Sequence, residues 1–351
     1  MPASTSRIDA ASVPASRITA YSTSALAGFV LSWGFSAPCA QGEGFGPFPV
    51  RNFHPLQQLV LQIPGDRANV VPKGTLDLRL EVAETAAIYR ETSEQASITA
   101  KFETLRNGLF MRYGVTDKLE VALEVPVLYR YRGFMEGMIK AVERATTGLA
   151  PARKALSGVG YAYNVTRGGQ TVVRGSEGAV GLGDTTMMAK YQVLSETSTL
   201  PAVAVRAAVK LPTGEESEYF GSGSPDFGIG LAAEKSFAGR WILYANVNGV
   251  FPTGKIGGMP LQPTLSGLAA VEYLWTENFS LTLQFDYYSP PFHGVGLKAL
   301  DKGVTELVTG FNYRLSPLWL WQVYGVENTD LITGSAPDFT LATLFTYRFR
   351  S

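Results

Sequence analysis

Two stretches of alternating apolar and polar residues lie between Thr104 and Arg130, on either side of a tight turn at 116–118. The apolar residues keep one parity within each stretch: Leu105, Leu109, Met111, Tyr113 and Val115, then Leu119, Val121, Leu123 and Val125. A period of two over this length predicts a pair of antiparallel strands, each with one apolar and one polar face. Such hairpins also occur in soluble sandwiches, so the fold class depends on what recurs along the chain.

The same alternation recurs from Gly74 to the C-terminus, where we count twelve candidate strands. The clearest is 279–288, FSLTLQFDYY, in which apolar and polar residues alternate at nearly every position. The expected strands are 75–83, two within 104–130, 184–194, 202–211, 226–235, 241–250, 264–274, 279–288, 304–314, 318–326 and 338–350.

The connections between these strands alternate in length. Short turns follow the even-numbered strands and long connections follow the odd-numbered ones, among them 84–97 and 126–183. Aromatic residues gather beside the short turns, as in the interfacial girdle of outer-membrane barrels, which also combine tight periplasmic turns with larger extracellular loops. Closure would leave no unpaired strand edge in hydrocarbon. The sequence therefore predicts an all-β fold: a single transmembrane antiparallel β-barrel of about 12 strands over residues 74–351.

Composition agrees with this fold and excludes others. The 351 residues are 46% hydrophobic, but no run of 18 apolar residues occurs, so a spanning helix is excluded. The mean hydropathy of +0.06 is what strands with one lipid-facing and one polar face produce. Thirty basic and 30 acidic residues cancel, which argues against a nucleic-acid partner.

The N-terminus has the pattern of an export signal. Two arginines precede an apolar segment at 25–35, which is followed by Ser-Ala-Pro-Cys-Ala. We expect residues 1–40 to be a signal peptide and the mature protein to reach the cell outer membrane of a Gram-negative bacterium. A lipid anchor on Cys39 is the alternative, although Pro38 stands where a small residue is expected. Residues 41–73 show no clear period and are expected to form a periplasmic N-terminal segment or a lumen plug.

Seven short motifs occur in order along the mature chain: Arg51-Asn52-x-x-Pro55, Tyr113 to Asp117, Tyr131-x-Gly133-Phe134, Gly181 to Asp184, Lys210 to Gly214, Gly221 to Gly223 with Asp226, and Ala336 to Phe339. They resemble an uncharacterised family of bacterial outer-membrane β-barrel proteins, a domain of unknown function similar to the phenol-degradation meta-pathway barrels. The resemblance implies a barrel whose looser relatives pass small organic compounds. Outer-membrane barrels usually end on an aromatic residue read by the barrel insertion machinery, whereas here Arg350 and Ser351 follow Phe349.

The connection after the third strand contains an expected amphipathic helix, GFMEGMIKAVERATT. Its apolar side chains recur at helical spacing. We interpret it as a lid or gate at the barrel mouth; the alternative is a helix that packs on the rim and orders the loop. The candidate gate residues are Phe134, Met135, Met138, Ile139 and Val142.

Two other patterns favour ordinary structure over chemistry. GVFPTGKI at 249–256 matches a phosphate-binding loop superficially, but lacks the Ser or Thr for magnesium and leads into no helix. Glu215, Glu216, Glu218 and Asp226, in or beside the 212–225 loop, could hold calcium, although a solvated acidic loop is the simpler interpretation.

The two histidines do not predict a catalytic site. His293 lies in an expected outer loop with Ser289 nearby, at a spacing that does not argue a triad, and the other histidine is His54. We therefore predict that the protein is not an enzyme and uses no cofactor or metal.

The polar faces of the strands carry acids and bases interleaved, without a ring of one sign that would select ions. Such charges either pair in a sealed interior or line a narrow wet channel. The candidate lumen-lining residues are Asp77, Arg79, Glu81, Arg106, Arg112, Glu120, Glu124, Lys190, Arg206, Lys210, Glu272, Gln284, Asp286, Glu306, Arg314, Gln322 and Arg348.

The leading hypothesis from the sequence is a passive outer-membrane channel for small organic molecules, including hydrophobic or amphipathic ones. Its expected partners are the lipid of the outer membrane, the insertion machinery during biogenesis and a small organic solute. The alternative hypotheses are a sealed barrel with a structural or assembly role and, third, an enzyme that modifies outer-membrane lipid.

Overall fold

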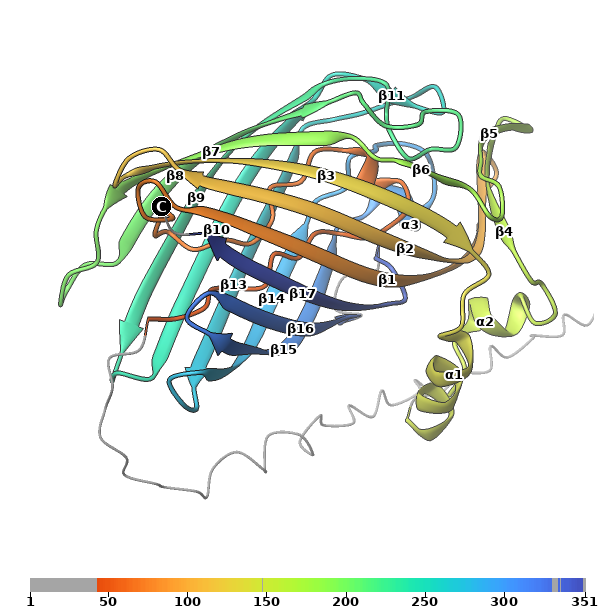
Figure 1. Cartoon of the computed structure of the whole chain (residues 1–351). Helices are drawn as coiled ribbons and strands as arrows, with labels where there is room; N and C mark the ends of the chain where they lie inside the picture. The colour runs from red at the N-terminus through yellow and green to blue at the C-terminus, as the bar shows by residue number, and fades with distance from the viewer. Residues whose placement is uncertain (1–42, 147, 330–333, 335, 350–351) are drawn as a thin grey trace, which may run out of the picture. The chain divides into compact units, whose positions relative to one another are not determined.

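The computed structural model describes residues 43–146, 148–329, 334 and 336–349. The expected signal peptide, residues 1–40, lies outside the described residues, together with Cys39, Arg350 and Ser351. Figure 1 shows the described chain as a barrel of long tilted strands, with an irregular N-terminal stretch inside it.

Twelve antiparallel strands close the barrel, which confirms the predicted fold class. Neighbouring strands pair in chain order, and the first and last strands complete the circle with Leu76 opposite Phe349 and Ala86 opposite Phe339. The barrel strands are β1 (Leu76–Thr92), β2 (Ala96–Gly114), β3 (Leu119–Tyr131), β7 (Thr185–Leu194), β8 (Ala202–Leu211), β9 (Asp226–Phe237), β10 (Trp241–Pro252), β13 (Thr264–Leu274), β14 (Phe279–Tyr288), β15 (Val304–Ser316), β16 (Trp319–Asn328) and β17 (Phe339–Phe349).

The side chains of each barrel strand alternate between an exposed apolar set and a buried polar set. In β14, for example, Leu281, Leu283 and Phe285 are exposed, whereas Gln284 and Asp286 between and beyond them are buried. We call the outward-facing apolar residues the apolar band. Such a band is stable against hydrocarbon and costly against water, so it fits a barrel that spans a bilayer.

One expected connection is wrong. Residues 84–97 were predicted to form a long loop, but β1 and β2 remain paired up to Thr92 opposite Ser97. The sequence pattern ended early because the next outward-facing residue after Val82 is the polar Glu84. The two strands continue past the apolar band, where an apolar outward face is no longer needed, so their alternation ends before their pairing does.

Shorter elements fill the long connections. The hairpin β4 (Ala162–Arg167) and β5 (Gln170–Arg174) pairs with the upper part of β2, β6 (Val180–Leu182) pairs with β3, and β11 (Lys255–Ile256) pairs with β12 (Met259–Pro260). Helices α1 (Glu136–Ala145) and α2 (Pro151–Ala155) follow β3, and α3 (Lys298–Asp301) follows β14. Among the described residues no helix has the length and apolarity needed to cross a membrane.

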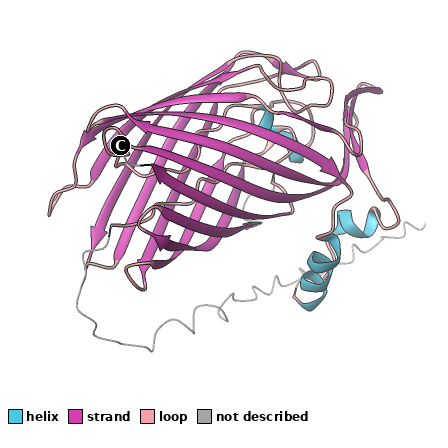
Figure 2. Cartoon of the chain, in the orientation of Figure 1, coloured by secondary structure: helices cyan, strands magenta, loops and turns pink. Residues whose placement is uncertain are grey.

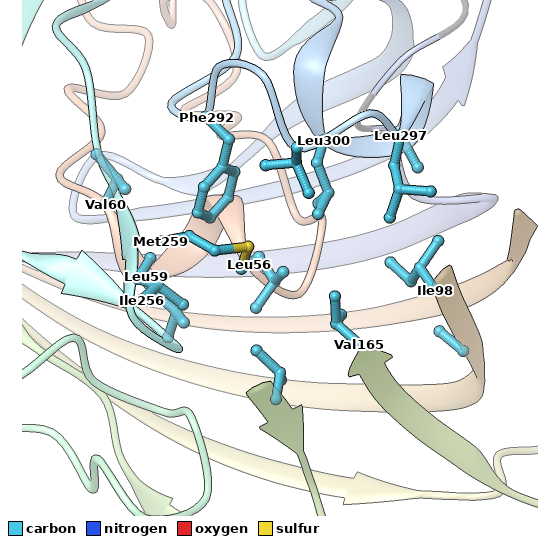
Figure 3. Close-up of a cluster of buried hydrophobic side chains, with 14 of the residues drawn as sticks. Leu56, Leu59, Val60, Ile98, Val165, Ile256, Met259, Phe292, Leu297 and Leu300 are labelled. Atoms are coloured by element: carbon cyan, nitrogen blue, oxygen red, sulfur yellow. The ribbon is translucent and has the colours of Figure 1, made fainter. Parts of the chain in front are cut away.

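The long connections lie at one end of the barrel, the long-loop end, and the tight turns at the other, the short-turn end. At the long-loop end a group of buried apolar side chains, the apical cluster, joins the loops to a 3-10 turn, η2 (Gln57–Leu59), of the N-terminal stretch (Figure 3). Its labelled members are Leu56, Leu59, Val60, Ile98, Val165, Ile256, Met259, Phe292, Leu297 and Leu300.

Candidate functional site

The lumen is the candidate functional site, because the predicted polar residues occupy inward positions of their strands. Thirteen of the seventeen are buried: Asp77, Glu81, Arg106, Glu120, Glu124, Lys190, Arg206, Lys210, Glu272, Gln284, Asp286, Glu306 and Gln322. The other four are partly buried: Arg79, Arg112, Arg314 and Arg348. Buried charges need partners, and the structure shows what those partners are.

Much of the lumen is filled by residues 43–73, which we call the lumen segment. It starts at the short-turn end, where the backbone N–H of Phe45 donates to both oxygens of the Glu272 carboxylate at 3.2 and 3.1 Å. Further in, the N–H of Phe48 donates to the Gln284 side chain at 2.9 Å. The segment then reaches the apical cluster at Leu56 and turns back (Figure 1).

On its return the lumen segment again bonds wall side chains through its backbone. The N–H of Leu61 donates to Asp226 at 2.8 Å, and the carbonyl of Pro64 accepts from Arg206 at 2.7 Å. Closer to the short-turn end, the N–H of Val71 donates to Glu120 at 2.7 Å. A chain without secondary structure can be buried only if its backbone groups find partners, and here the polar wall supplies many of them.

A buried chain of charges ties the segment to the first three strands. Glu124 on β3 accepts from Arg51 of the lumen segment and from Arg106 on β2, and Arg106 also pairs with Glu81 on β1. All four side chains are nearly inaccessible to solvent. Removing one member would leave a partner charged and unpaired in a low-dielectric interior, which is strongly destabilising.

A second charged group surrounds Asp66 of the lumen segment. Lys190 donates to it at 2.7 Å and Arg112 at 3.2 Å. Burial by itself would raise the pKa of Asp66, but the attraction of Lys190 and Arg112 outweighs burial and holds that pKa well below its usual range. The side chain of Asp66 is therefore ionised in the lumen.

Glu234 on β9 forms a third anchor. Its carboxylate accepts from Arg67 at 2.9 Å, from the N–H of Ala68 at 3.0 Å, and from the Asn69 side chain. Glu234 was not among the predicted lumen residues. Glu234 lies on the face of β9 opposite to the apolar residues Phe227, Ile229 and Leu231. This alternation was the signal that could have identified it as a lumen residue.

The acidic residues considered for calcium do not converge. Asp226 and Asp184 both bind Lys210 at 2.9 Å, so Asp226 faces a cation that belongs to the wall. Glu218 instead accepts from Ser176. In the part of the chain that the structure describes, no group of three His, Cys, Asp or Glu side chains is placed to hold a metal ion.

Other candidate lumen residues contact side chains of neighbouring barrel strands. Arg348 donates to Asp77 at 2.8 Å, and Arg79 lies over the Phe110 ring at 4.2 Å. Glu306 stands out, because the structure gives its buried carboxylate oxygens no hydrogen-bond partner.

Little free space is left around the lumen segment. A cavity of about 40 Å³ lies between Gly65 of the segment and Arg79, Arg112 and Lys190 of the wall. A larger cavity of about 180 Å³ lies at the short-turn end, lined by Phe45, Asp77, Arg314 and others. At the opposite end the apical cluster packs against the lumen segment.

The predicted gate residues are not over the lumen, which corrects the expectation of a lid. The backbone N–H groups of Phe134 and Met135 both donate at 2.8 Å to Glu103. Glu103 lies on the outward face of β2, whereas Arg106 lies on the inward face. Helix α1 therefore lies outside the barrel (Figure 2). Met135 is buried beside Glu103, whereas Phe134, Met138 and Val142 are exposed and Ile139 is partly buried.

The histidines are separated. His54 is fully buried in the lumen segment beside Tyr89, and burial lowers its pKa to about 3. His293 is exposed, and the nearby Ser289 hydroxyl accepts a hydrogen bond from the N–H of Leu265. The structure thus shows no contact between His293 and Ser289 among the described residues, and the expectation that the protein is not an enzyme stays a prediction.

Comparison with known proteins gives a family and a fold. The sequence model of the family described as "Protein of unknown function (DUF3187)" matches residues 33–349. No curated protein matches the chain. The crystal structure of the COG4313 outer membrane channel from Pseudomonas putida F1 is 13% identical, with a TM-score of 0.56 over 82% of this chain and 100% of that one. The KdgM porin is 8% identical, with a TM-score of 0.40 over 79% of this chain and 99% of that one. The likeness to the COG4313 channel shows that the barrel has the fold of an outer-membrane protein.

Proposed function

We propose that this chain, which belongs to the DUF3187 family of proteins of unknown function, is an outer-membrane channel that passively admits small organic molecules, including hydrophobic and amphipathic ones. No energy source or cofactor enters the proposal. The predicted export signal and the apolar band support the outer membrane of a Gram-negative bacterium as its location.

The observation that carries this proposal is that the lumen is wide enough to hold a separate stretch of polypeptide. A barrel with only a structural role can fill its interior with the side chains of its own strands. Here the wall instead directs its polar groups at a terminal segment, which is covalently joined to the barrel only where residue 73 meets the start of β1. Displacing that segment would leave a polar passage through the wall residues that now hold it.

The chemistry along the path supports the solute class. At the long-loop end a solute would meet the apolar side chains of the apical cluster, such as Phe292, Leu297 and Met259. Deeper in, it would meet paired charges of both signs. An apolar entrance followed by a mixed polar lumen suits uncharged or amphipathic organic molecules better than simple ions. The similarity to phenol-degradation meta-pathway barrels stays a prediction, which a screen of permeating solutes would test.

The second candidate function is the sealed barrel. The many hydrogen bonds between the lumen segment and the wall favour it, because a permanently closed interior needs most of its buried polar groups paired. The two candidates differ in whether the lumen segment can move.

Conductance in planar bilayers separates the two candidates. Glu234→Ala removes the anchor of Arg67 and Ala68, and the loss of a partner for a buried charge costs on the order of 3 kcal/mol. The matched control is Glu196→Ala, because Glu196 binds Lys235 and Ser236 away from the lumen segment. We expect rare brief openings for the natural protein and for the control, and frequent openings for Glu234→Ala.

A reversible lock completes the test. Ala68 of the lumen segment and Ala204 of the wall belong to one buried group, so we choose these positions for a cysteine pair whose disulfide would hold the segment in the barrel. The locked form should be silent and should regain openings after reduction. Silence of all forms, including Glu234→Ala, would overturn the channel proposal in favour of the sealed barrel.

A further inference from the structure

Helix α1 exposes its apolar face. The exposed side of the helix carries Met138 and Val142, which are 50 and 58% exposed, and Phe134, two residues before the helix, is 74% exposed. At 100° per residue Met138 and Val142 lie roughly 40° apart, and Ala141 and Ala145 fall on the same side. A surface helix in water has the reverse arrangement, with its charged residues outward and its apolar stripe against the protein.

The charged side of α1 is held against the rest of the chain. Glu136 binds Lys101 of β2 at 3.0 Å and Lys140 of its own helix at 2.8 Å. Glu143, about two turns after Glu136, binds Arg153 of α2 at 3.0 Å. These ion pairs set the rotation of the helix about its axis, so the apolar face is turned outward by the fold.

The start of the helix is anchored on the outer wall. Glu103 accepts hydrogen bonds from the N–H groups of Phe134 and Met135. N–H groups at the beginning of a helix have no acceptor within the helix. The chain reaches this carboxylate through Gly133, whose φ of 83° is in the left-handed region. A Cβ at this position would lie 1.8 Å from the Glu103 carboxylate carbon, so any other residue would displace this carboxylate as well as strain the backbone.

The anchor lies at the upper edge of the apolar band. On the outward face of β2 and β3, Leu105 lies opposite Tyr129, and the next outward pair is Glu103 opposite Tyr131. The two tyrosine rings stack at 4.9 Å. One such step is about 7 Å along a strand. The residue that anchors the start of α1 thus lies about 7 Å along the strand from the last apolar pair, at a level where tyrosines commonly mark the membrane interface.

We propose that α1 is an interfacial helix whose apolar face inserts into the outer leaflet of the membrane around the barrel. Its occupant is lipid, because Glu103 anchors the start of the helix at the edge of the apolar band that lipid covers. Arg144 and Lys154 are exposed beside it and have no ion pair among the described residues, so they are placed to bind anionic headgroups. This role does not depend on transport: it would hold equally for a sealed barrel.

Spin labelling of the full chain in proteoliposomes tests the proposal. A nitroxide is attached to Met138→Cys in a Cys39→Ser background, in vesicles of phosphatidylethanolamine and phosphatidylglycerol. Its collisions with oxygen, which concentrates in lipid, are compared with collisions with a water-soluble nickel chelate. Leu283→Cys in the apolar band is the lipid reference, and Gln170→Cys, exposed at the β4–β5 turn, is the water reference. A heat-dependent shift in electrophoretic mobility shows that each variant is folded.

We expect the label at 138 to resemble the label at 283, with an oxygen-to-nickel ratio several-fold above that at 170. Replacing phosphatidylglycerol by phosphatidylcholine should lower this ratio, and the additional change Arg144→Gln with Lys154→Gln should abolish the dependence on phosphatidylglycerol. Nickel access at 138 equal to that at 170 would overturn the proposal. Protection from both reagents would also overturn it, because it would mean that protein covers this face.

Discussion

Asp286 on β14 and Glu306 on β15 lie directly opposite each other inside the barrel, and neither forms an ion pair with any described residue. Asp286 accepts a hydrogen bond from Gln284 at 2.9 Å, whereas the oxygens of Glu306 accept none. Like charges at this spacing repel, and their burial adds a desolvation cost. The pair is therefore a weak point in a lumen whose other acids mostly have cationic or backbone partners.

Glu306→Gln should stabilise the barrel. It removes one of two facing buried carboxylates and keeps the shape of the side chain, so we expect a gain of about 2 kcal/mol in the free energy of unfolding. Heat denaturation followed by the electrophoretic mobility of the folded barrel measures this. The matched control is Glu277→Gln, because Glu277 is exposed in the turn between β13 and β14. A destabilised Glu306→Gln would mean that a cation or another partner occupies the site.

His54 should make the folded lumen sensitive to acid. Its Nδ1 accepts the N–H of Leu56 at 3.2 Å, and its Nε2 has no hydrogen-bond partner among the described residues, so the folded ring is neutral. Burial lowers its pKa from 6.5 to about 3. Between these values the unfolded chain binds more protons than the folded chain, so this contribution to stability falls as the pH falls, by about 1.4 kcal/mol per pH unit.

The difference in unfolding free energy between the natural protein and His54→Asn isolates this effect. The natural protein should lose about 2 kcal/mol more than the variant between pH 6.5 and pH 4.5, because half of the unfolded histidine is already protonated at pH 6.5. His293→Asn, at the exposed histidine, should leave the pH dependence of the natural protein unchanged. An equal acid response in all three proteins would contradict the assignment of a buried neutral ring.

Glu124→Gln should loosen the lumen segment as well as destabilise the barrel. Glu124 is the common acceptor of Arg51 and Arg106, and only Arg106 has a second acid, Glu81. Loss of the charge leaves Arg51 without an ion pair and should cost on the order of 3 kcal/mol. Because Arg51 belongs to the lumen segment, limited proteolysis should then cut within 43–73 at a protease concentration that leaves Glu277→Gln intact.

Gly133→Ala should detach α1 from the outer wall without opening the barrel. The new methyl group would collide with Glu103, whereas Gly148→Ala, at the same φ of 83°, meets nothing within 4 Å. Both changes carry the backbone cost of a left-handed alanine, about 1 kcal/mol, so their difference isolates the contact with Glu103. Trypsin should cut after Lys140 faster in Gly133→Ala alone, with no change in conductance. A conductance change confined to Gly133→Ala would restore the gate interpretation of this helix.

The period of two in the sequence was enough to predict most barrel strands, since the alternation is imposed by the two environments on either side of one wall. β14, for instance, occupies the predicted 279–288. The same alternation identified Glu124 and Lys190 as inward residues. It failed at 84–97, because above the apolar band a strand no longer needs an apolar face, and it omitted Glu234.

Other features were decided only by the tertiary structure. Residues 41–73 have no period, so the sequence left their place open between the periplasm and the lumen. The described part of this stretch, 43–73, contacts wall residues such as Glu272, which is 227 positions from Phe45 in the chain. The spacing of Phe134, Met138 and Val142 predicted a helix with an apolar face, but the direction of that face depends on Lys101 and Glu103. Periodicity records which residues share a surface. Which surface meets water, lipid or another part of the chain depends on contacts between distant residues, and these exist only once the barrel has closed.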